Sequence, residues 1–298
     1  MTHVEDEIAD QPACWARALD EYSRWEPVLP RDGERVAVVG CGTSLFMAQA
    51  FAALREAGGH GETDAFPASE VPDRRYDRVL GLSRSATTTE MVELLDQLRG
   101  RVPTVVITGV ADAPVSRAAD ACVVLDFADE RAVVQTRFAT TALVLLRAHL
   151  GESPARLAEA ADQALTAELS AGATECTQFT FLGRGWTVGL AREAALKLRE
   201  AALAWTEAYP AMEYRHGPIS VTDERSLVWS LGEPPAGLAG EVRAAGGRWE
   251  CSVRDPLADL VRVHRLAVAL ARRDGLDPDR PRNLSRSVVL GTGPGRGR

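Results

Sequence analysis

The chain has 298 residues, of which 46% are hydrophobic and 26% charged, as in ordinary globular proteins, and it is long enough for two domains. Its net charge of -8 argues against nucleic acid or an anionic membrane as the main partner, because both attract basic surfaces. No apolar run approaches the roughly 18 residues of a membrane-spanning helix, and the first residues lack the apolar stretch of a signal peptide, so we expect a cytoplasmic protein.

Cysteine and histidine spacing gives no sign of a disulfide framework or a metal site. The five cysteines are odd in number and no two stand at CxxC spacing, which favours reduced thiols. The five histidines are scattered and lack ligand spacings such as HExxH. We therefore expect no metal, and no motif indicates a cofactor.

The first half of the chain alternates short apolar runs with helical patterns, after a helical lead-in over residues 1–30. Four apolar runs predict strands, at residues 35–39, 78–82, 104–108 and 121–125. Helical patterns lie between and after them, at residues 45–57, 90–99 and 133–150. Strands that alternate with helices are typical of a parallel sheet covered on both faces.

The pattern then starts again after an alanine-rich connecting helix over residues 154–170. The second half is expected to contain strands at 177–182 and 226–231, helices at 190–203 and 257–273, and one further helix and strand between them. We therefore predict an α/β protein with two doubly wound parallel-sheet domains flanked by helices. The expected segments are a lead-in at 1–34, a first domain at 35–152, a connecting helix at 153–174 and a second domain at 175–298.

Two turns in the first half are candidates for an anion site. The first, Gly40-Cys41-Gly42-Thr43-Ser44, joins a strand to a helix, where glycines allow close approach and the helix N-terminus offers free N–H groups. It lacks the third glycine of GxGxxG and the lysine of a P-loop, which argues against a nucleotide. Taken alone, such a turn is also common for purely steric reasons.

The second turn carries five hydroxyl side chains within residues 83–89, beside Arg84. Capping of the next helix needs only one hydroxyl, whereas several donors next to an arginine suit a phosphate. Both turns follow strands of one predicted parallel sheet, so both should lie at its carboxyl edge, where ligands usually bind. Together they favour a phosphoryl ligand over ordinary capping.

Glu193, Lys197 and Glu200 share one face of a predicted helix, because their spacings are four and seven residues. A solvated Glu–Lys–Glu ladder is the ordinary explanation. The flanking helix is rich in alanine and leucine, however, and a partly buried carboxylate with a raised pKa suits a general base. Lys197 is also the only lysine among the 34 basic residues.

His216 precedes Gly217-Pro218 in a predicted loop and could protonate a ring oxygen near neutral pH. A hydrogen bond within the loop is the more common role for such a histidine, and spacing alone favours that role.

These segments together resemble the isomerase half of glucosamine-6-phosphate synthase, a protein with tandem sugar isomerase (SIS) domains. The resemblance covers nearly the whole chain. It rests on residues 181–185, 193–200, 207–210 and 216–218, on the two turns at 40–44 and 83–88, and on residues 7–12, 133–137 and 280–288.

The resemblance implies a phosphosugar substrate and roles for individual residues. The phosphate would be held by hydroxyl side chains, those of Thr43, Ser44, Ser83, Ser85 and Thr88. The substrate site would also include Gly42, Arg84, Val133, Gln135 and Arg286. Glu200 would move a proton between C1 and C2, with Glu193 as the second candidate base, and Lys197 would stabilise the developing charge. His216 would assist ring opening from a second subunit, which implies a homodimer.

Several residues depart from the family pattern. Arg286 stands where the family has a lysine that can form a Schiff base, and a guanidinium is not a nucleophile. Ala86 and Arg84 replace a glycine and a glutamine of the phosphate loop. No glutaminase segment is visible, so we do not expect amidotransferase activity.

Three functions remain open from the sequence. The first is proton abstraction at C2 of an amino-sugar or hexose 6-phosphate, giving aldose–ketose isomerisation or deamination. The second is a lyase that expels the C3 hydroxyl of N-acetylglucosamine 6-phosphate. The third is a sensor that binds a phosphosugar without turning it over, although sensing does not need the Glu, Lys and His set.

Overall fold

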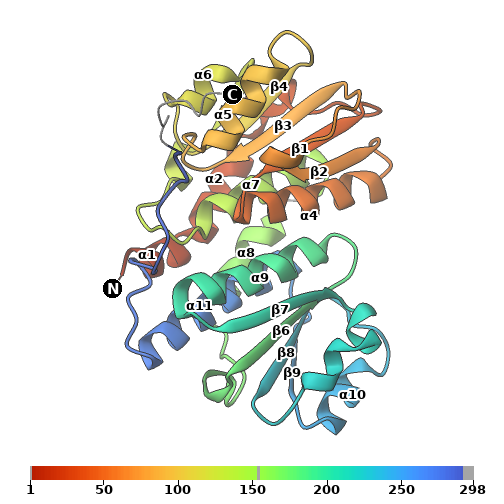
Figure 1. Cartoon of the computed structure of the whole chain (residues 1–298), viewed down its shortest axis with the longest axis vertical. Helices are drawn as coiled ribbons and strands as arrows, with labels where there is room; N and C mark the ends of the chain where they lie inside the picture. Colours follow the sequence, from red (N-terminus) through yellow and green to blue (C-terminus); the bar gives the residue numbers. More distant parts are fainter. Residues whose placement is uncertain (1, 153–154, 291–298) are drawn as a thin grey trace, which may run out of the picture.

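The computed structural model describes residues 2–152 and 155–290. Two parallel sheets lie one above the other along the long axis of the molecule, each flanked by helices, which confirms the predicted α/β class (Figure 1). Residues 1, 153–154 and 291–298 lie outside the described residues, and they include the predicted domain boundary at 152/153 and the end of the second domain. No helix in the described ranges is long and apolar enough to cross a membrane.

The first sheet has the strand order β2-β1-β3-β4-β5, and all of its strands are parallel. Its strands are β1 Val36–Gly40, β2 Thr63–Pro67, β3 Arg78–Ser83, β4 Thr104–Thr108 and β5 Ala121–Val124. Strands β1 and β3 are neighbours, with Val39 opposite Gly81. The turns that follow these two strands therefore leave the same edge of the sheet side by side.

The second sheet repeats this arrangement with the order β7-β6-β8-β9. Its strands are β6 Gln178–Gly183, β7 Trp205–Pro210, β8 Ser226–Leu231 and β9 Arg248–Cys251. The central strands β6 and β8 are fully or almost fully buried, as expected for a parallel sheet covered on both faces.

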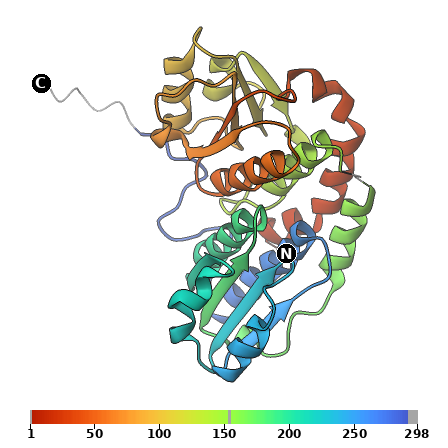
Figure 2. The same cartoon turned by 90° about the vertical axis from the view of Figure 1, so that its right-hand side faces the viewer.

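Helices cover both sheets and join them. The α-helices are α1 His3–Ala9, α2 Gln11–Asp20, α3 Tyr22–Trp25, α4 Thr43–Ala57, α5 Thr89–Leu98, α6 Pro114–Ala118, α7 Arg137–His149, α8 Ala155–Thr166, α9 Thr187–Ala202, α10 Leu238–Ala244 and α11 Pro256–Arg273. Short 3-10 turns are η1 Glu26–Val28, η2 Ala68–Glu70, η3 Asp126–Ala128, η4 Ala173–Glu175, η5 Glu213–His216 and η6 Pro218–Val221. After α11 the chain runs back to the first sheet, where Thr89 N donates to Val288 O at 3.1 Å (Figure 2).

Two expectations need correction. The predicted helix over residues 133–150 begins only at Arg137, because the buried carboxylate of Glu130 accepts hydrogen bonds from Thr136 N at 2.5 Å and Arg137 N at 2.9 Å. Residues 133–135 therefore belong to a loop. Strands β2 and β7 were not predicted, because both are edge strands and lack a continuous apolar run.

Helices α4 and α9 lie face to face between the two sheets (Figure 1). Gly189 of α9 allows this close approach: a Cβ atom at this position would stand 2.5 Å from the carbonyl oxygen of Phe46 and 2.9 Å from Ala50 N. Beside this crossing, Arg192 Nη1 donates to Gln49 Oε1 at 2.6 Å. The contact fixes α9 of the second half against the helix that follows the first glycine turn.

Arg147 of α7 contacts the residues that precede α9 and α11. Its guanidinium donates to both carboxylate oxygens of Asp255, the N-cap of α11, at 2.8 and 2.7 Å. It also lies 4.9 Å from the ring centroid of Trp186, the residue before α9. A planar, bidentate guanidinium suits such a site better than an ammonium would. One side chain of the first half thus positions the N-termini of α9 and α11.

The close approach at Gly189 makes a specific prediction about stability. Gly189→Ala should lower the free energy of unfolding by about 1–3 kcal/mol, because the new methyl group overlaps the backbone of α4. Gly240→Ala is the matched control: Gly240 lies inside α10 with no atom near its Cβ position, so alanine should add about 0.5–1 kcal/mol. Urea unfolding of both variants checks this, and equal effects would contradict the account of the crossing.

Candidate active site

Lys197 is the centre of a buried cluster that joins the two halves of the chain. Its Nζ lies 2.9 Å from Thr43 Oγ1, 2.5 Å from Glu200 Oε2 and 3.3 Å from Glu193 Oε1. The three residues predicted to share a helical face do so on α9, and Thr43 at the first turn of α4 meets them from the first half. The structure thus brings the glycine turn and the α9 carboxylates together.

The two carboxylates of this cluster have different surroundings. Glu193 is 1% exposed and its Oε2 has no hydrogen-bond partner among the described residues. Burial raises the pKa of Glu193 to about 8, although the nearby Lys197 charge acts in the opposite direction. The side chain of Glu200 is 19% exposed. Glu193 therefore holds its proton at neutral pH, whereas Glu200 is the carboxylate that a ligand can reach.

Burial and ion pairing also act on Lys197. Burial disfavours its charged form, but the neighbouring Glu193 and Glu200 outweigh this and raise the pKa of Lys197 above its ordinary value. The side chain is therefore an ammonium at any physiological pH. Such a buried cation can stabilise negative charge on a substrate oxygen.

A small polar pocket lies at the carboxyl edge of the first sheet, next to this cluster. It is lined by Cys41, Ser44, Leu82, Ser83, Arg84, Ser85, Thr88, Met91, Gln135 and Arg286. Its volume is about 30 Å³, and one water needs roughly 10–15 Å³ by this measure. The pocket therefore suits one compact group such as a phosphoryl group rather than a whole sugar.

Backbone and hydroxyl groups of the second turn shape this pocket. Ala86 adopts a φ of 53°, a left-handed conformation that alanine rarely takes and that glycine would accept without strain. Ser85 Oγ accepts hydrogen bonds from Thr87 N at 3.4 Å and Thr87 Oγ1 at 3.1 Å, and Thr88 Oγ1 lies 3.3 Å from Ser287 Oγ. Gly42 has a φ of 56° and leaves the first turn of α4 without a side-chain cap.

Arg84 and Arg286 hold loops in place as well as lining the pocket. Arg84 is buried and donates to the carbonyl oxygens of Ala132, Val133 and Arg286 at 2.9, 3.2 and 3.0 Å. Arg286 pairs with Asp129 at 2.5 Å and also donates to the carbonyl oxygen of Glu130. Both terminal nitrogens of each guanidinium group therefore donate to protein atoms, whereas the buried Nε of Arg84 has no partner among the described residues.

The remaining predicted residues divide into two groups. Gln135 lines the pocket, and its buried Oε1 has no hydrogen-bond partner within the described ranges. Val133 and Gly42 do not line the pocket; Val133 supplies a carbonyl oxygen to Arg84. His216 is exposed at the end of η5, and no hydrogen bond or ion pair among the described residues joins it to the Lys197 cluster.

Sequence reasoning missed Glu130, Asp129 and His264. Glu130 is 1% exposed and orders the loop that carries Gln135. The one sequence feature that could have indicated this role is its position shortly before a long apolar helix. His264 of α11 is buried beside Gln11, and burial together with the Lys197 charge lowers the pKa of His264 to about 3. His264 stands among apolar residues of a predicted helix, and this pattern does not predict that it lies near Lys197.

The raised pKa of Glu193 predicts a pH-dependent stability. The folded chain binds this proton more tightly than the unfolded chain, so stability from this group is complete below the ordinary value of 4.5 and falls as pH rises towards 8. Glu193→Gln removes this titration and should gain stability over the parent by about 1 kcal/mol per pH unit in that window. Urea unfolding of both proteins between pH 5 and 8 measures the difference, and parallel curves would contradict it.

Comparisons with known proteins give matches in sequence and in fold. Residues 31–150 match the model of the SIS domain. The chain is 28% identical to the glutamine–fructose-6-phosphate aminotransferase (isomerizing) of Methanothermobacter thermautotrophicus, over 95% of this chain and 57% of that protein. The chain thus spans little more than half the length of this relative. Because the match to the family model ends at residue 150, a second copy of the domain stays a prediction.

Solved structures show the same fold. Glucosamine-6-phosphate deaminase from Thermotoga maritima superposes with a TM-score of 0.79 at 26% identity, covering 97% of this chain and 100% of that one. Tagatose-6-phosphate ketose/aldose isomerase from Escherichia coli gives a TM-score of 0.78 at 20% identity, covering 98% and 97%, a likeness of fold alone. Residues 31–150 therefore match the SIS domain, and the chain is similar in sequence to part of the glutamine–fructose-6-phosphate aminotransferases.

Proposed function

We propose that this chain is a phosphosugar enzyme that abstracts the C2 proton of a hexosamine 6-phosphate and yields the ketose phosphate with loss of ammonia, or the corresponding isomer of a hexose 6-phosphate. The contact between Lys197 Nζ and Thr43 Oγ1 carries the proposal, because it places the α9 carboxylates next to the hydroxyl-rich turns of the first half. The site would lie between domains at residues 35–152 and 175–298.

The substrate phosphate would occupy the small pocket beneath the second turn. Ser44, Ser83, Ser85 and Thr88 supply hydroxyl donors there, and the N-terminus of α4 adds the positive end of its dipole. Held in this way, the phosphate would direct the sugar carbons towards the Lys197 cluster. Gln135 would offer its unpaired carbonyl oxygen to a substrate hydroxyl or amine.

Glu200 is the proposed base, because it is the more exposed carboxylate beside Lys197. Glu193 is the weaker candidate, since its raised pKa of about 8 keeps it protonated at neutral pH. The base would remove the C2 proton and return it at C1, while Lys197 stabilises the enolate-like oxygen that forms between these steps. With a hexosamine the proton shift gives the C2 imine, and one water hydrolyses this imine to the ketose phosphate and ammonia. No Schiff base with a lysine of the enzyme is required, which accords with Arg286 in place of a lysine.

His216 would complete the site of a second copy of the chain. It is exposed, and no hydrogen bond or ion pair among the described residues joins it to the Lys197 cluster of its own chain, so we assign its role in ring opening to the site of a partner. We therefore propose a homodimer with shared active sites, in which each site takes one histidine from the neighbouring subunit.

Deamination is favoured over the other outcomes by the likeness to the Thermotoga maritima deaminase, which extends over nearly the whole chain. Mass spectrometry of the products separates the alternatives. Incubation with glucosamine 6-phosphate should release ammonia, whereas isomerisation of a hexose 6-phosphate leaves the mass unchanged. Loss of water from N-acetylglucosamine 6-phosphate would instead identify a lyase.

Exchange of the C2 proton with heavy water tests the base directly. Glu200→Gln keeps the size of the side chain but removes the base, so exchange should fall about 100- to 10,000-fold while the substrate still binds. Glu193→Gln is the matched control on the same helix and should reduce exchange far less. Persistent exchange in Glu200→Gln, with loss in Glu193→Gln, would reverse the assignment. No exchange with any hexose or hexosamine 6-phosphate that binds would identify a sensor.

Mixing two inactive variants tests the shared site. His216→Ala and Glu200→Gln proteins should each be nearly inactive, yet their mixed dimer would contain one site with both Glu200 and a partner histidine. Subunit exchange should therefore restore up to a quarter of the parent activity, about half of the molecules being mixed dimers with one intact site each. An active species that sediments as a monomer at assay concentration would refute the shared site.

A further inference from the structure

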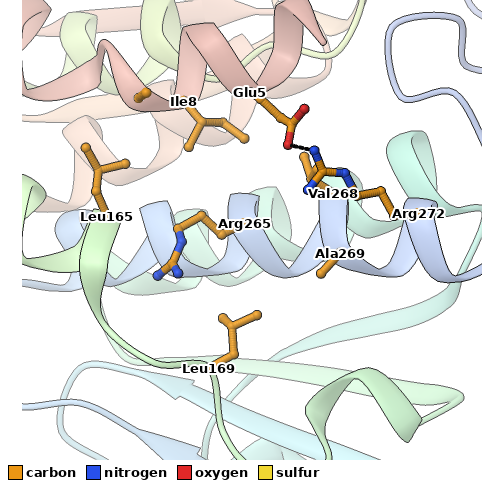
Figure 3. Close-up of a pocket in the computed structure, with 9 residues that line it drawn as sticks. Glu5, Ile8, Leu165, Leu169, Arg265, Val268, Ala269 and Arg272 are labelled. Carbon is orange, nitrogen blue, oxygen red and sulfur yellow. Dashed lines mark ion pairs between the residues drawn. The ribbon is translucent and has the colours of Figure 1, made fainter. Parts of the chain in front are cut away.

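A groove with no part in the chemistry described above lies where α1, the end of α8 and α11 meet (Figure 3). Its volume is about 400 Å³, and it shares no lining residue with the phosphate pocket. Most of its walls are apolar, formed by Ile8, Ala9, Leu165, Leu169, Val268 and Ala269. A concave site of this size with mainly apolar walls and few charged groups resembles sites for small organic ligands.

The charged residues of the groove are Glu5, Arg265 and Arg272, and they are not equivalent. Arg272 forms an ion pair with Glu5, so these two charges cancel. Arg265 forms no ion pair with any carboxylate in the part of the chain that the structure describes. Its Nη1 donates to the carbonyl oxygens of Ala164, at 2.9 Å, and Ala167. The groove therefore carries one net positive charge.

The charge of Arg265 is met by carbonyl oxygens at the C-terminal end of α8 and by no carboxylate of the described residues. Burial, and then the neighbouring cation of Arg262, lower the pKa of Arg265. Arg262 itself is compensated, since its Nη1 lies 2.8 Å from Glu250 Oε1 and 3.0 Å from Asp259 Oδ1. In Figure 3 the guanidinium of Arg265 extends towards the side of the groove where Leu165 and Leu169 lie. An anion bound there would gain both charge pairing and apolar contact.

We propose that this groove binds a small amphipathic monoanion, an apolar chain that ends in a single carboxylate. The carboxylate would pair with Arg265, because guanidinium and carboxylate match in geometry and charge. The apolar chain would cover Leu165, Leu169 and Val268. A phosphosugar does not fit this description, since its hydroxyl groups would face apolar walls without partners.

The groove is connected to the proposed active site through α11. This helix forms one wall of the groove, and it also packs against α9, which carries Glu193, Lys197 and Glu200. A ligand that bridges α1, α8 and α11 would bind the folded chain only and raise its thermal stability. The site does not depend on the proposed sugar chemistry, so its test can be read by binding alone.

Calorimetric titration of the full chain with octanoate, and separately with 1-octanol, tests the proposal. Octanoate should bind with one site per chain, at least ten-fold more tightly than the uncharged alcohol, and should raise the melting temperature. Saturating glucosamine 6-phosphate should leave octanoate bound, because the two sites share no residue. Equal affinity for the acid and the alcohol would overturn the role of Arg265.

Three variants sharpen the test. Arg265→Gln should weaken octanoate binding at least ten-fold. Arg273→Gln removes the same charge from the same helix but outside the groove, where Arg273 pairs with Asp274 at 2.6 Å, so binding should stay within two-fold of the parent. Ala269→Phe fills the groove without touching a charge and should abolish octanoate binding, which keeps the proposal testable if Arg265→Gln does not fold.

Two further results would overturn the proposal. The first is equal loss of octanoate binding in Arg265→Gln and Arg273→Gln, which would mean that only the overall charge of α11 matters. The second is a dimer in sedimentation experiments that Ala269→Phe dissociates, together with no octanoate binding at any concentration below its micelle threshold. The groove would then be an interface between copies of this chain.

Discussion

The buried ammonium of Lys197 is the interaction on which the candidate site depends. Its partners are Thr43 from α4 and two carboxylates from its own helix, at 2.9, 3.3 and 2.5 Å. A buried charge that loses such partners costs several kcal/mol, so α4 and α9 must stay in register. Gly189 allows the two helices to approach closely enough, and Arg147 fixes the start of α9. The packing of α4 against α9, two helices from different halves of the chain, therefore determines both the fold and the site.

Arginine side chains hold loops and helix ends in place in this chain, whereas the one lysine lies between two carboxylates. Arg84 and Arg286 hold the loops around the small polar pocket through carbonyl oxygens and Asp129. A planar guanidinium with several donors suits this work, whereas a compact ammonium can stand between carboxylates and face a substrate oxygen. In the Lys197 cluster, Glu193 is buried and Glu200 is partly exposed. Such a difference in surroundings gives neighbouring carboxyl groups different roles. Glu193 retains its proton, and Glu200 remains open to a ligand.

Local patterns predicted most of the architecture, and long-range contacts account for what they missed. The buried strands at 104–108 and 226–231 were predicted with their observed bounds: the first is a run of β-branched residues, and the second is a short and mainly apolar run. The edge strand β7 was missed, since Trp205 is 79% exposed and the strand has no apolar run. Helical spacing correctly placed Glu193, Lys197 and Glu200 on one face. No pattern in the sequence could show that Lys197 meets Thr43, or that Arg84 would turn towards the loop at 132–133.

A double-mutant cycle on Thr43 and Lys197 tests most directly whether the two halves build one site. Thr43→Val and Lys197→Met, alone and together, should each weaken binding of glucosamine 6-phosphate, as measured by calorimetry. The Thr43–Lys197 contact joins the glycine turn at residues 40–44 to α9. If the substrate binds across this contact, the loss of binding free energy in the double variant should differ from the sum of the losses in the single variants by about 0.5–3 kcal/mol, the range found for residues in contact. Additive effects would show that the contact between Thr43 and Lys197 does not couple the two halves in binding, and binding that neither variant changes would show that the sugar phosphate does not bind at this junction.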